Sequence, residues 1–225
     1  MARTLFITGT DTGVGKTVFT ALLAEFLRRR GDRVAALKPI CSGGRGDARV
    51  LRAALDGTLS LDEVNPWHFR APIAPVLAAE REKKAVSMEP VLAHIRAVQK
   101  RFDWVLVEGA GGLLSPLGTD FDSRDLMSAL RAVPVIVAQN KLGVVNQILL
   151  TLEALPRDLR HGARVVLMAP PCRDPATASN FELLGRLGVR QISRLPRMGG
   201  KFSPYEIWRK PGVRRALAAF ANLPG

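Results

Sequence analysis

Apolar runs rich in valine, isoleucine and leucine alternate with segments of helical periodicity along the chain. The apolar runs predict strands at residues 4–8, 33–38, 104–108, 133–139, 164–169 and 191–195. Most of these runs are continuously apolar, as expected of strands covered on both faces of a parallel sheet. The helical periods predict helices at residues 16–30, 48–55, 89–101, 124–131, 146–155, 180–185 and 213–220. The alternation predicts an α/β fold, with a mostly parallel central sheet and helices on both faces.

Two stretches, residues 57–87 and 198–211, lack a clear period because glycine and proline interrupt them. We expect loops in both, some of which line the ligand site. No repeat or low-complexity segment divides the chain, so residues 1–225 are expected to form a single domain. In open parallel sheets the ligand lies beyond the C-terminal strand ends, so polar residues at those ends are the candidates for chemistry.

The composition is that of an ordinary globular protein, with 47% hydrophobic and 24% charged residues among 225. No apolar run approaches the ~18 to 20 residues that a membrane span requires, and no secretory leader is apparent before the first strand. We therefore expect a soluble, cytoplasmic protein without a membrane partner. Cys41 and Cys172 can in principle pair, but two reduced thiols are more common in that compartment.

The formal charge of +13 raises the question of nucleic-acid binding, because basic surfaces attract phosphate backbones. The arginines, however, are scattered through ordinary segments, without interleaved aromatic residues or a recognisable nucleic-acid module. Solvated helix faces explain this distribution better than a nucleic-acid groove, and we expect no nucleic-acid partner.

A glycine-rich loop, Gly9 to Thr17, joins the first predicted strand to the first predicted helix. Its main-chain amides can point at phosphate oxygens, and the helix N-terminus adds its positive end. Lys16 would reach the β and γ phosphates of a nucleotide and Thr17 would ligate magnesium. The loop departs from the strict phosphate-loop motif, because Gly9 lies one residue early and Thr10 stands at the expected glycine position. The context still predicts a P-loop NTPase-like fold rather than a surface turn. The predicted nucleotide contacts are Gly13, Val14, Gly15, Lys16, Thr17 and Val18.

Two carboxylates are placed to complete a magnesium site. Glu108 ends a strand and precedes the flexible run Gly109, Ala110 and Gly111, which would let the backbone approach phosphates. A carboxylate there is not expected to be buried without a cationic partner, although a solvated strand-end acid is the alternative. Asp47 can reach inward as a further ligand or serve as the N-cap of the following helix.

Lys38 closes the second predicted strand, which Pro39 ends. A second ammonium group near the γ phosphate would neutralise the charge that develops during phosphoryl transfer. The alternative is an exposed strand-end lysine without a special role.

Taken together, these segments resemble the dethiobiotin synthetase family. The matching pieces appear in the family's order and spread over about two thirds of the chain. They are Thr8 to Thr12 with Gly15 to Thr17, Lys38-Pro39 with Ser42-Gly43, Asp47, Trp104 to Gly112, and Lys141 to Gly143 with Asn146.

The resemblance implies that 7,8-diaminononanoate takes up carbon dioxide as a carbamate on one amine and that ATP phosphorylates this carbamate. The second amine then closes the ring of dethiobiotin and releases phosphate. By the same resemblance Thr17, Asp47 and Glu108 hold Mg²⁺, and Lys16 and Lys38 are catalytic. Thr12 and Ser42 would face the diamine or its carbamate.

The resemblance also implies a homodimer, in which Leu142, Gly143 and Asn146 reach the neighbouring subunit's substrate. Gln147 replaces a histidine found in many relatives. Ala169 and Pro170 stand where relatives often present an Asn-Asp-like pair to the base. The base is then read by backbone groups near residues 196–198, Pro196 among them, or several nucleoside triphosphates are accepted. The tail from Gly199 has no match.

Three other functions compete with this interpretation. Amide synthesis on corrin rings normally needs a second, glutamine-hydrolysing domain, and we expect none after residue 225. A partitioning-type ATPase switch that binds DNA or membrane would carry a lysine early in the loop, where Asp11 stands. Asn140-Lys141 resembles a guanine-reading motif, but Gly143 occupies the position of its aspartate. An inactive relative is suggested only by Ala169.

Overall fold

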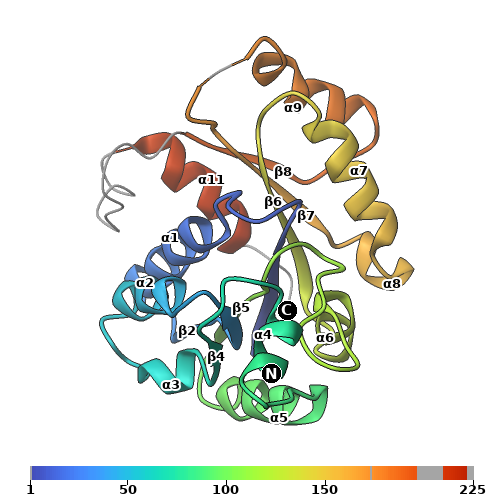
Figure 1. Ribbon diagram of the computed structural model, residues 1–225. Coiled ribbons are helices and arrows are strands. Elements are labelled where there is room, and N and C mark those ends of the chain that lie inside the picture. Colours follow the sequence, from blue (N-terminus) through green and yellow to red (C-terminus); the bar gives the residue numbers. More distant parts are fainter. Residues whose placement is uncertain (1, 173, 197–209, 222–225) are drawn as a thin grey trace.

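The computed structural model describes residues 2–172, 174–196 and 210–221. Its centre is a sheet of six parallel strands in the order β2-β5-β1-β6-β7-β8 (Figure 1). The strands are β1 (Arg3–Gly9), β2 (Val34–Leu37), β5 (Trp104–Glu108), β6 (Val133–Gln139), β7 (Arg164–Met168) and β8 (Ile192–Leu195). All six predicted strands are confirmed, and the α/β class with them.

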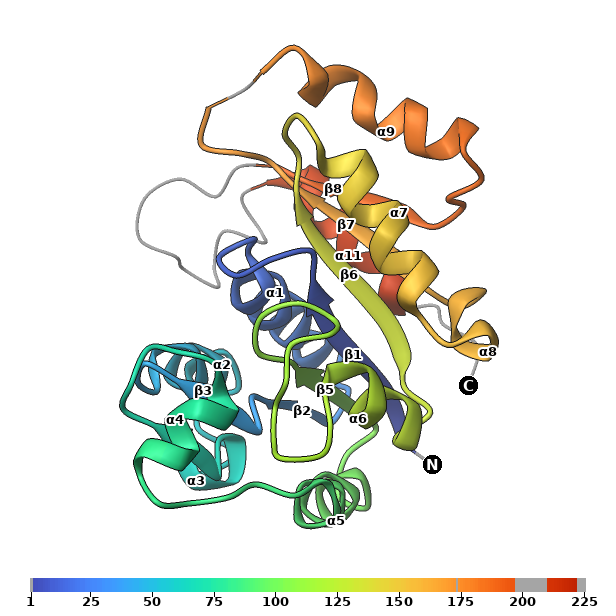
Figure 2. The same cartoon turned by 45° about the vertical axis from the view of Figure 1, so that its right-hand side comes forward.

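Helices cover both faces of the sheet (Figure 2). One face carries α1 (Lys16–Arg29), α2 (Gly46–Ala54) and α11 (Pro211–Ala221). The other carries α5 (Met88–Gln99), α6 (Ser123–Ala129), α7 (Val144–Ala154) and the short α8 (Arg157–Arg160), with α9 (Ala176–Arg186) beside α7. All seven predicted helices are present; α8, a single turn, was not predicted.

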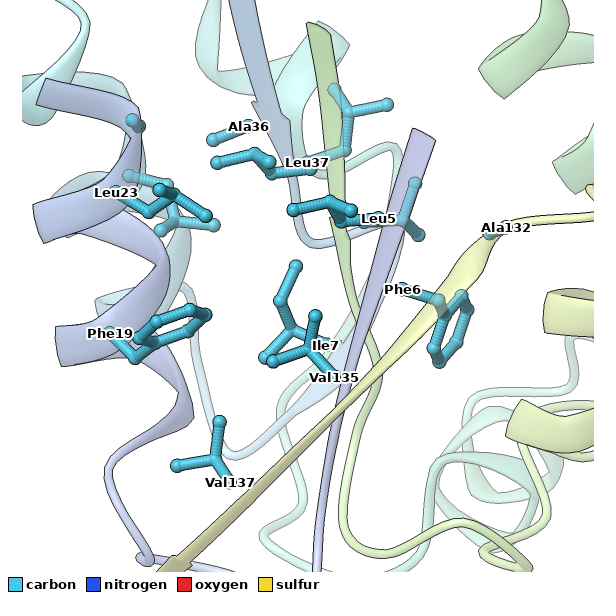
Figure 3. Packing of buried hydrophobic residues seen from close by; sticks show 14 of the residues in the cluster. Leu5, Phe6, Ile7, Phe19, Leu23, Ala36, Leu37, Ala132, Val135 and Val137 are labelled. Atoms are coloured by element: carbon cyan, nitrogen blue, oxygen red, sulfur yellow. The ribbon is translucent and has the colours of Figure 1, made fainter. Parts of the chain in front are cut away.

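The central strand β1 is apolar on both sides because each side meets a helical layer. Leu5 and Ile7 point toward α1, where Phe19 and Leu23 lie, and Phe6 points to the opposite face (Figure 3). All five side chains are fully buried. Two-sided burial explains why the strand reads as one continuous apolar run.

The prediction of loops throughout residues 57–87 was wrong. This stretch holds α3 (Leu61–Val64), β4 (Trp67–Phe69) and α4 (Pro75–Arg81), and β4 pairs in parallel with β3 (Ile40–Ser42) in a separate small sheet. Figure 2 shows these elements grouped beyond the β2 edge. Proline misled the prediction, because Pro75 stands at the start of α4, where its missing N–H costs nothing. Residues 198–209 of the second predicted loop lie outside the described residues.

None of the helices in the described part of the chain is long and apolar enough to cross a membrane. Cys41 is buried and Cys172 is exposed, and both are free thiols.

Candidate active site

Three neighbouring strands, β1, β2 and β5, end at the same edge of the sheet and place the candidate residues together. Ile7 of β1 lies opposite Glu108, and Leu37 of β2 lies opposite Val107. Lys38, the next residue along, therefore arrives beside Glu108. A cavity of about 760 Å³ opens at this edge between the glycine-rich loop, Lys38, Glu108 and the segment before α4. Its volume is within the range of ordinary small-molecule sites.

The glycine-rich loop needs its glycines for different reasons. Gly13 and Gly15 adopt positive φ angles of 74° and 104°, which favour glycine. A Cβ on Gly9 would lie 2.8 Å from a Val14 methyl carbon and 2.9 Å from the Asp11 carbonyl oxygen. Gly9, which stands one residue early in the motif, is therefore required because Asp11 and Val14 of the same loop leave no room for a Cβ. Lys16 Nζ donates to the Asp11 carbonyl oxygen at 2.8 Å, so its side chain folds back along the loop.

Glu108 is the hub of a buried polar cluster. Its Oε1 accepts hydrogen bonds from Thr17 Oγ1 at 2.8 Å and from Lys38 Nζ at 2.7 Å. Lys38 also donates to the Gly109 carbonyl oxygen at 3.0 Å and forms an ion pair with Asp47 at 3.2 Å. Glu108 is 1% and Lys38 4% exposed. This burial excludes both the solvated acid and the exposed lysine as interpretations.

Asp47 does not cap α2 through its side chain. The N-cap residue is Arg45, without a side-chain cap bond, and Asp47 lies in the first helical turn. Its carboxylate instead pairs with Lys38. Of the two roles left open from the sequence, only the inward-facing one agrees with the structure.

The two ammonium groups respond to burial in opposite ways. The pKa of Lys16 is lowered to about 8, chiefly by burial and then by the nearby charge of Lys38, while the charges of Glu108, Asp47 and Asp11 act in the opposite direction. Burial also disfavours the Lys38 ammonium, but the charges of Glu108 and Asp47 outweigh it and raise its pKa. Lys38 is therefore held by carboxylates, whereas Lys16 is a buried cation short of negative charge.

The oxygen donors here fit a divalent ion. Glu108 Oε2 is buried and has no hydrogen-bond partner, while the Thr17 hydroxyl lies against Oε1 of the same carboxylate. Mg²⁺ commonly takes one or two carboxylates and completes its shell with water and phosphate oxygens. In the described residues no three His, Cys, Asp or Glu side chains gather as a metal cage, so an all-protein site is not indicated there.

The far wall of the cavity was not predicted residue by residue. Pro72, Ile73, Ala74 and Pro75 line it, and Ser42 Oγ donates to the Ile73 carbonyl oxygen at 2.5 Å. These residues are apolar and carry no motif, so the sequence offered only the general expectation that residues 57–87 approach the site. Ser115 and Pro116, also on the wall, follow the glycine run.

Most predicted site residues meet at this cavity. Those on its lining are Thr12, Gly13, Gly15, Lys16, Thr17, Val18, Lys38, Ser42, Asp47, Glu108, Ala110 and Gly111. Val14 is buried behind the loop, and Gly109 contributes its carbonyl to Lys38.

Four predicted residues lie away from the cavity lining. Leu142, Gly143 and Asn146 are exposed at the start of α7, with Leu142 78% exposed. Pro196 follows β8 and is exposed. The start of α7 can thus meet a second molecule, as the sequence prediction requires, but it does not contribute to the cavity of its own chain.

Comparisons with known proteins point the same way as the geometry. A family model described as an AAA domain matches residues 3–200. A protein of Anaeromyxobacter dehalogenans (strain 2CP-C) named ATP-dependent dethiobiotin synthetase BioD is 41% identical over 222 residues, covering 96% of this chain and 95% of that protein. The protein of the same name from Bacillus subtilis (strain 168) is 38% identical over 203 residues, covering 87% and 88%.

Solved structures similar to this chain share its fold at low sequence identity. A ParA family ATPase from Chlorobium tepidum TLS superposes with a TM-score of 0.63 at 14% identity and covers 99% of this chain and 100% of that one. A chain of the MinC:MinD cell division protein complex from Aquifex aeolicus gives 0.62, also at 14% identity, covering 100% of this chain and 98% of that one. At such identities the likeness shows the fold alone.

Proposed function

Because the chain belongs to the ATP-dependent dethiobiotin synthetase family, whose members are enzymes of biotin biosynthesis, we propose that it converts 7,8-diaminononanoate, CO2 and ATP to dethiobiotin, ADP and phosphate. The observation that carries this proposal is the cluster of Lys16, Lys38, Thr17 and Glu108 at one end of a cavity whose other wall is apolar. One end suits a triphosphate and the other suits an aliphatic chain.

The residues divide the work between binding and charge stabilisation. The amides of Gly13 to Thr17 hold the phosphates, and Lys16 leaves the Asp11 carbonyl to meet them. Lys38, fixed by Glu108 and Asp47, places its charge beside the transferred phosphoryl group. Thr17, Glu108 and Asp47 would hold Mg²⁺, which supplies charge neutralisation on the phosphate oxygens.

No protein nucleophile is required by this chemistry. One substrate amine carries the carbamate, phosphorylation makes its oxygen a leaving group, and the second amine of the same molecule attacks the carbon. The enzyme's contribution is to hold these groups close and in line. Thr12 and Ser42 face the reacting end, and the wall of Pro72 to Pro75 packs against the methylene chain.

We also place a second subunit at the active site. Leu142, Gly143 and Asn146 are exposed at the N-terminal end of α7, whose first amides favour a carboxylate. The Leu142 amide is not one of these, because it already donates to Asp174. In a homodimer these residues would reach the carboxylate end of the partner's diamine. The exposed side chains of Leu142, before α7, and Leu150, on α7, support such an interface.

The proposal is tested by incubating the protein with the diamine, bicarbonate, Mg²⁺ and ATP and measuring phosphate and dethiobiotin. Lys16→Ala is expected to lower turnover by at least ~10²-fold, as for loss of other charge-stabilising donors. Lys100→Ala, a surface lysine at the opposite edge of the sheet, serves as the matched control. Phosphate release that does not depend on the diamine would refute the assignment.

The same assay with CTP and GTP addresses the base. The Ala169 side chain offers no hydrogen-bonding atom, and its amide already donates to the Leu195 carbonyl oxygen. Turnover rates that agree within about tenfold for ATP, CTP and GTP would mean that the protein discriminates little between bases. A strong preference for ATP assigns base recognition to backbone groups beyond β8.

A further inference from the structure

Lys38 and the start of α2, which carries Asp47, are hydrogen-bonded to residues that do not line the cavity. Asn65 ends α3 and is fully buried, although its amide is polar. Buried amides persist in proteins when their donors and acceptors are satisfied. Asn65 donates to the Trp67 carbonyl oxygen at 3.3 Å and accepts from Cys41 Sγ at 3.2 Å. Its other side-chain partners belong to the two segments that deliver Lys38 and Asp47 to the site.

The first segment is the turn that follows β2. Asn65 Nδ2 donates to the Lys38 carbonyl oxygen at 2.7 Å, and the Lys38 amide donates to the Val64 carbonyl oxygen at 2.9 Å. Both backbone groups of Lys38 are thus tied to consecutive residues at the end of α3. The end of α3 therefore fixes the direction in which the Lys38 side chain leaves the backbone, and Glu108 fixes the position of its ammonium group.

The second segment is the start of α2. Asn65 Oδ1 accepts from Arg45 Nε at 3.1 Å, and Arg45 Nη2 donates to the carbonyl oxygens of Leu61 at 2.6 Å and Asn65 at 2.9 Å. Arg45 is the N-cap residue of α2, two positions before Asp47. Its guanidinium thereby anchors the first turn of α2, and Asp47 with it, to the end of α3.

We propose that Asn65 and Arg45 are positioning residues for phosphoryl transfer, Asn65 orienting Lys38 and Arg45 orienting Asp47. The inference rests on the proposed function, since it takes Lys38 and Asp47 as working groups. A displacement of about 1 Å among reacting groups can lower the rate by ~10²-fold. Loss of the hydrogen bonds of Asn65 or Arg45 is expected to lower turnover by up to this factor.

Two substitutions separate the roles. Asn65→Asp keeps an oxygen for Arg45 but replaces the donor to Lys38 with a carboxylate oxygen that repels the carbonyl. Its kcat at saturating Mg²⁺ is expected to fall by about 10- to 100-fold, while KM for ATP stays within about threefold.

Arg45→Met keeps the approximate length of the side chain but removes the hydrogen bonds that hold the first turn of α2 to the end of α3. Its main effect is expected at Asp47, as an increase of about tenfold in the Mg²⁺ concentration required for half-maximal rate.

The matched control is Asp62→Asn. Asp62 pairs with Arg45 at 2.7 Å, but its side chain is 84% exposed, and such surface pairs contribute little. Its kcat and Mg²⁺ requirement are expected to equal those of the unmodified protein. Rates are expressed per folded molecule, with folding followed by circular dichroism, so that loss of stability is not mistaken for loss of positioning.

A second readout needs no turnover. Binding of a non-hydrolysable ATP analogue is titrated with Mg²⁺, and Arg45→Met is expected to shift the midpoint to higher Mg²⁺ while Asp62→Asn leaves it unchanged. If both positioning variants show unchanged kcat per folded molecule and unchanged Mg²⁺ midpoints, the inference is overturned. Absence of diamine-dependent activity in the unmodified protein would instead overturn the proposed function, and the Mg²⁺ midpoint would still decide the role of Arg45.

Discussion

At the scale of single residues, the two lysines of the candidate active site differ in how their charges are balanced. Lys38 sits between two carboxylates, whereas the hydrogen bond of Lys16 goes to a backbone carbonyl. A buried ammonium with little compensation gains most when an anion arrives. Lys16 is therefore the group whose protonation should couple most strongly to nucleotide binding.

Nucleotide affinity is expected to fall as pH rises above about 8, the pKa of Lys16 in the free protein. Bound phosphates favour the ammonium and raise this pKa, so between the two pKa values binding must take up one proton. The dissociation constant should then increase by up to about tenfold per pH unit. Calorimetry of a non-hydrolysable ATP analogue between pH 7 and pH 9.5, in buffers of different ionisation enthalpy, measures both affinity and proton uptake.

Lys16→Arg is the control for this prediction, because a guanidinium stays charged throughout that range. Its affinity is lower at pH 7, and its dependence on pH should be nearly lost. An unmodified protein whose affinity is flat from pH 7 to pH 9.5 would show that the charge of Lys16 is not linked to binding.

Lys16, Thr17, Lys38 and Glu108 could be found from the sequence because each stands beside a strand end or in a recognisable loop. Asn65 could not. Its importance depends on contacts with Lys38, 27 positions earlier in the chain, and with Arg45, 20 positions earlier. No local sequence pattern indicates contacts between residues so far apart. Polar residues that act through other residues become visible only when the chain is folded.

At the scale of elements, the turn between β6 and α7 is fastened to the start of α9. Asn180 Nδ2 donates to Asn140 Oδ1 at 2.9 Å and to the Lys141 carbonyl oxygen at 3.2 Å. Asp174 Oδ2 accepts from the Leu142 amide at 2.7 Å. These bonds hold in one conformation the exposed turn that we assign to the partner's substrate.

Asp174→Ala is expected to lower the hydrogen-exchange protection of the Leu142 amide by about tenfold or more. The hydrogen bond from this amide is the main cause that holds the pKa of Asp174 below its usual value of 3.8. A depressed pKa means that the bond is fully present above the usual value and is lost as pH falls through the pKa in the folded protein. Protection in the unmodified protein should therefore also decrease in acid.

Glu182→Ala provides the comparison, because Glu182 lies on α9 and pairs only with exposed Arg186 among the interactions seen in the described residues. It should leave the protection of Leu142 unchanged. Equal protection in all three proteins would mean that Asp174 does not restrain the turn.

The elements beyond β2 mark the limit of prediction from pattern. Five of the six strands of the main sheet have four to six buried residues each, and the resulting continuous apolar runs identified them in the sequence. The strands β3 and β4 have three residues each, and α3 is a single turn, so no period can develop. One local signal was present in the sequence: Ser60 and Glu63 form a capping box that starts α3.

At the scale of the whole molecule, one side carries an apolar surface that the chain itself does not cover. Of α7, only Val144 and Ile148 are buried, although most of the helix is apolar. Six large hydrophobic side chains are exposed in the described part of the chain, and four of them lie on or beside α7 and α9: Leu142, Leu150, Leu183 and Leu187. Large exposed apolar side chains on two neighbouring helices favour an interface over a free surface.

Leu150→Glu is expected to separate the proposed homodimer into monomers. Leu150 is 62% exposed on α7, and a charge buried at an apolar interface should raise the dimer dissociation constant by ~10²-fold or more. Sedimentation velocity measures this change. Ala97→Glu is the control, because Ala97 is exposed on α5, which Figure 2 shows at the bottom of the molecule, away from α7 and α9. The monomeric variant should keep its affinity for the ATP analogue, since the phosphate loop belongs to its own chain. Its KM for the diamine should increase, since Leu142 to Asn146 no longer reach a partner's cavity. A monomer that retained the original KM for the diamine would show that each cavity works without its neighbour.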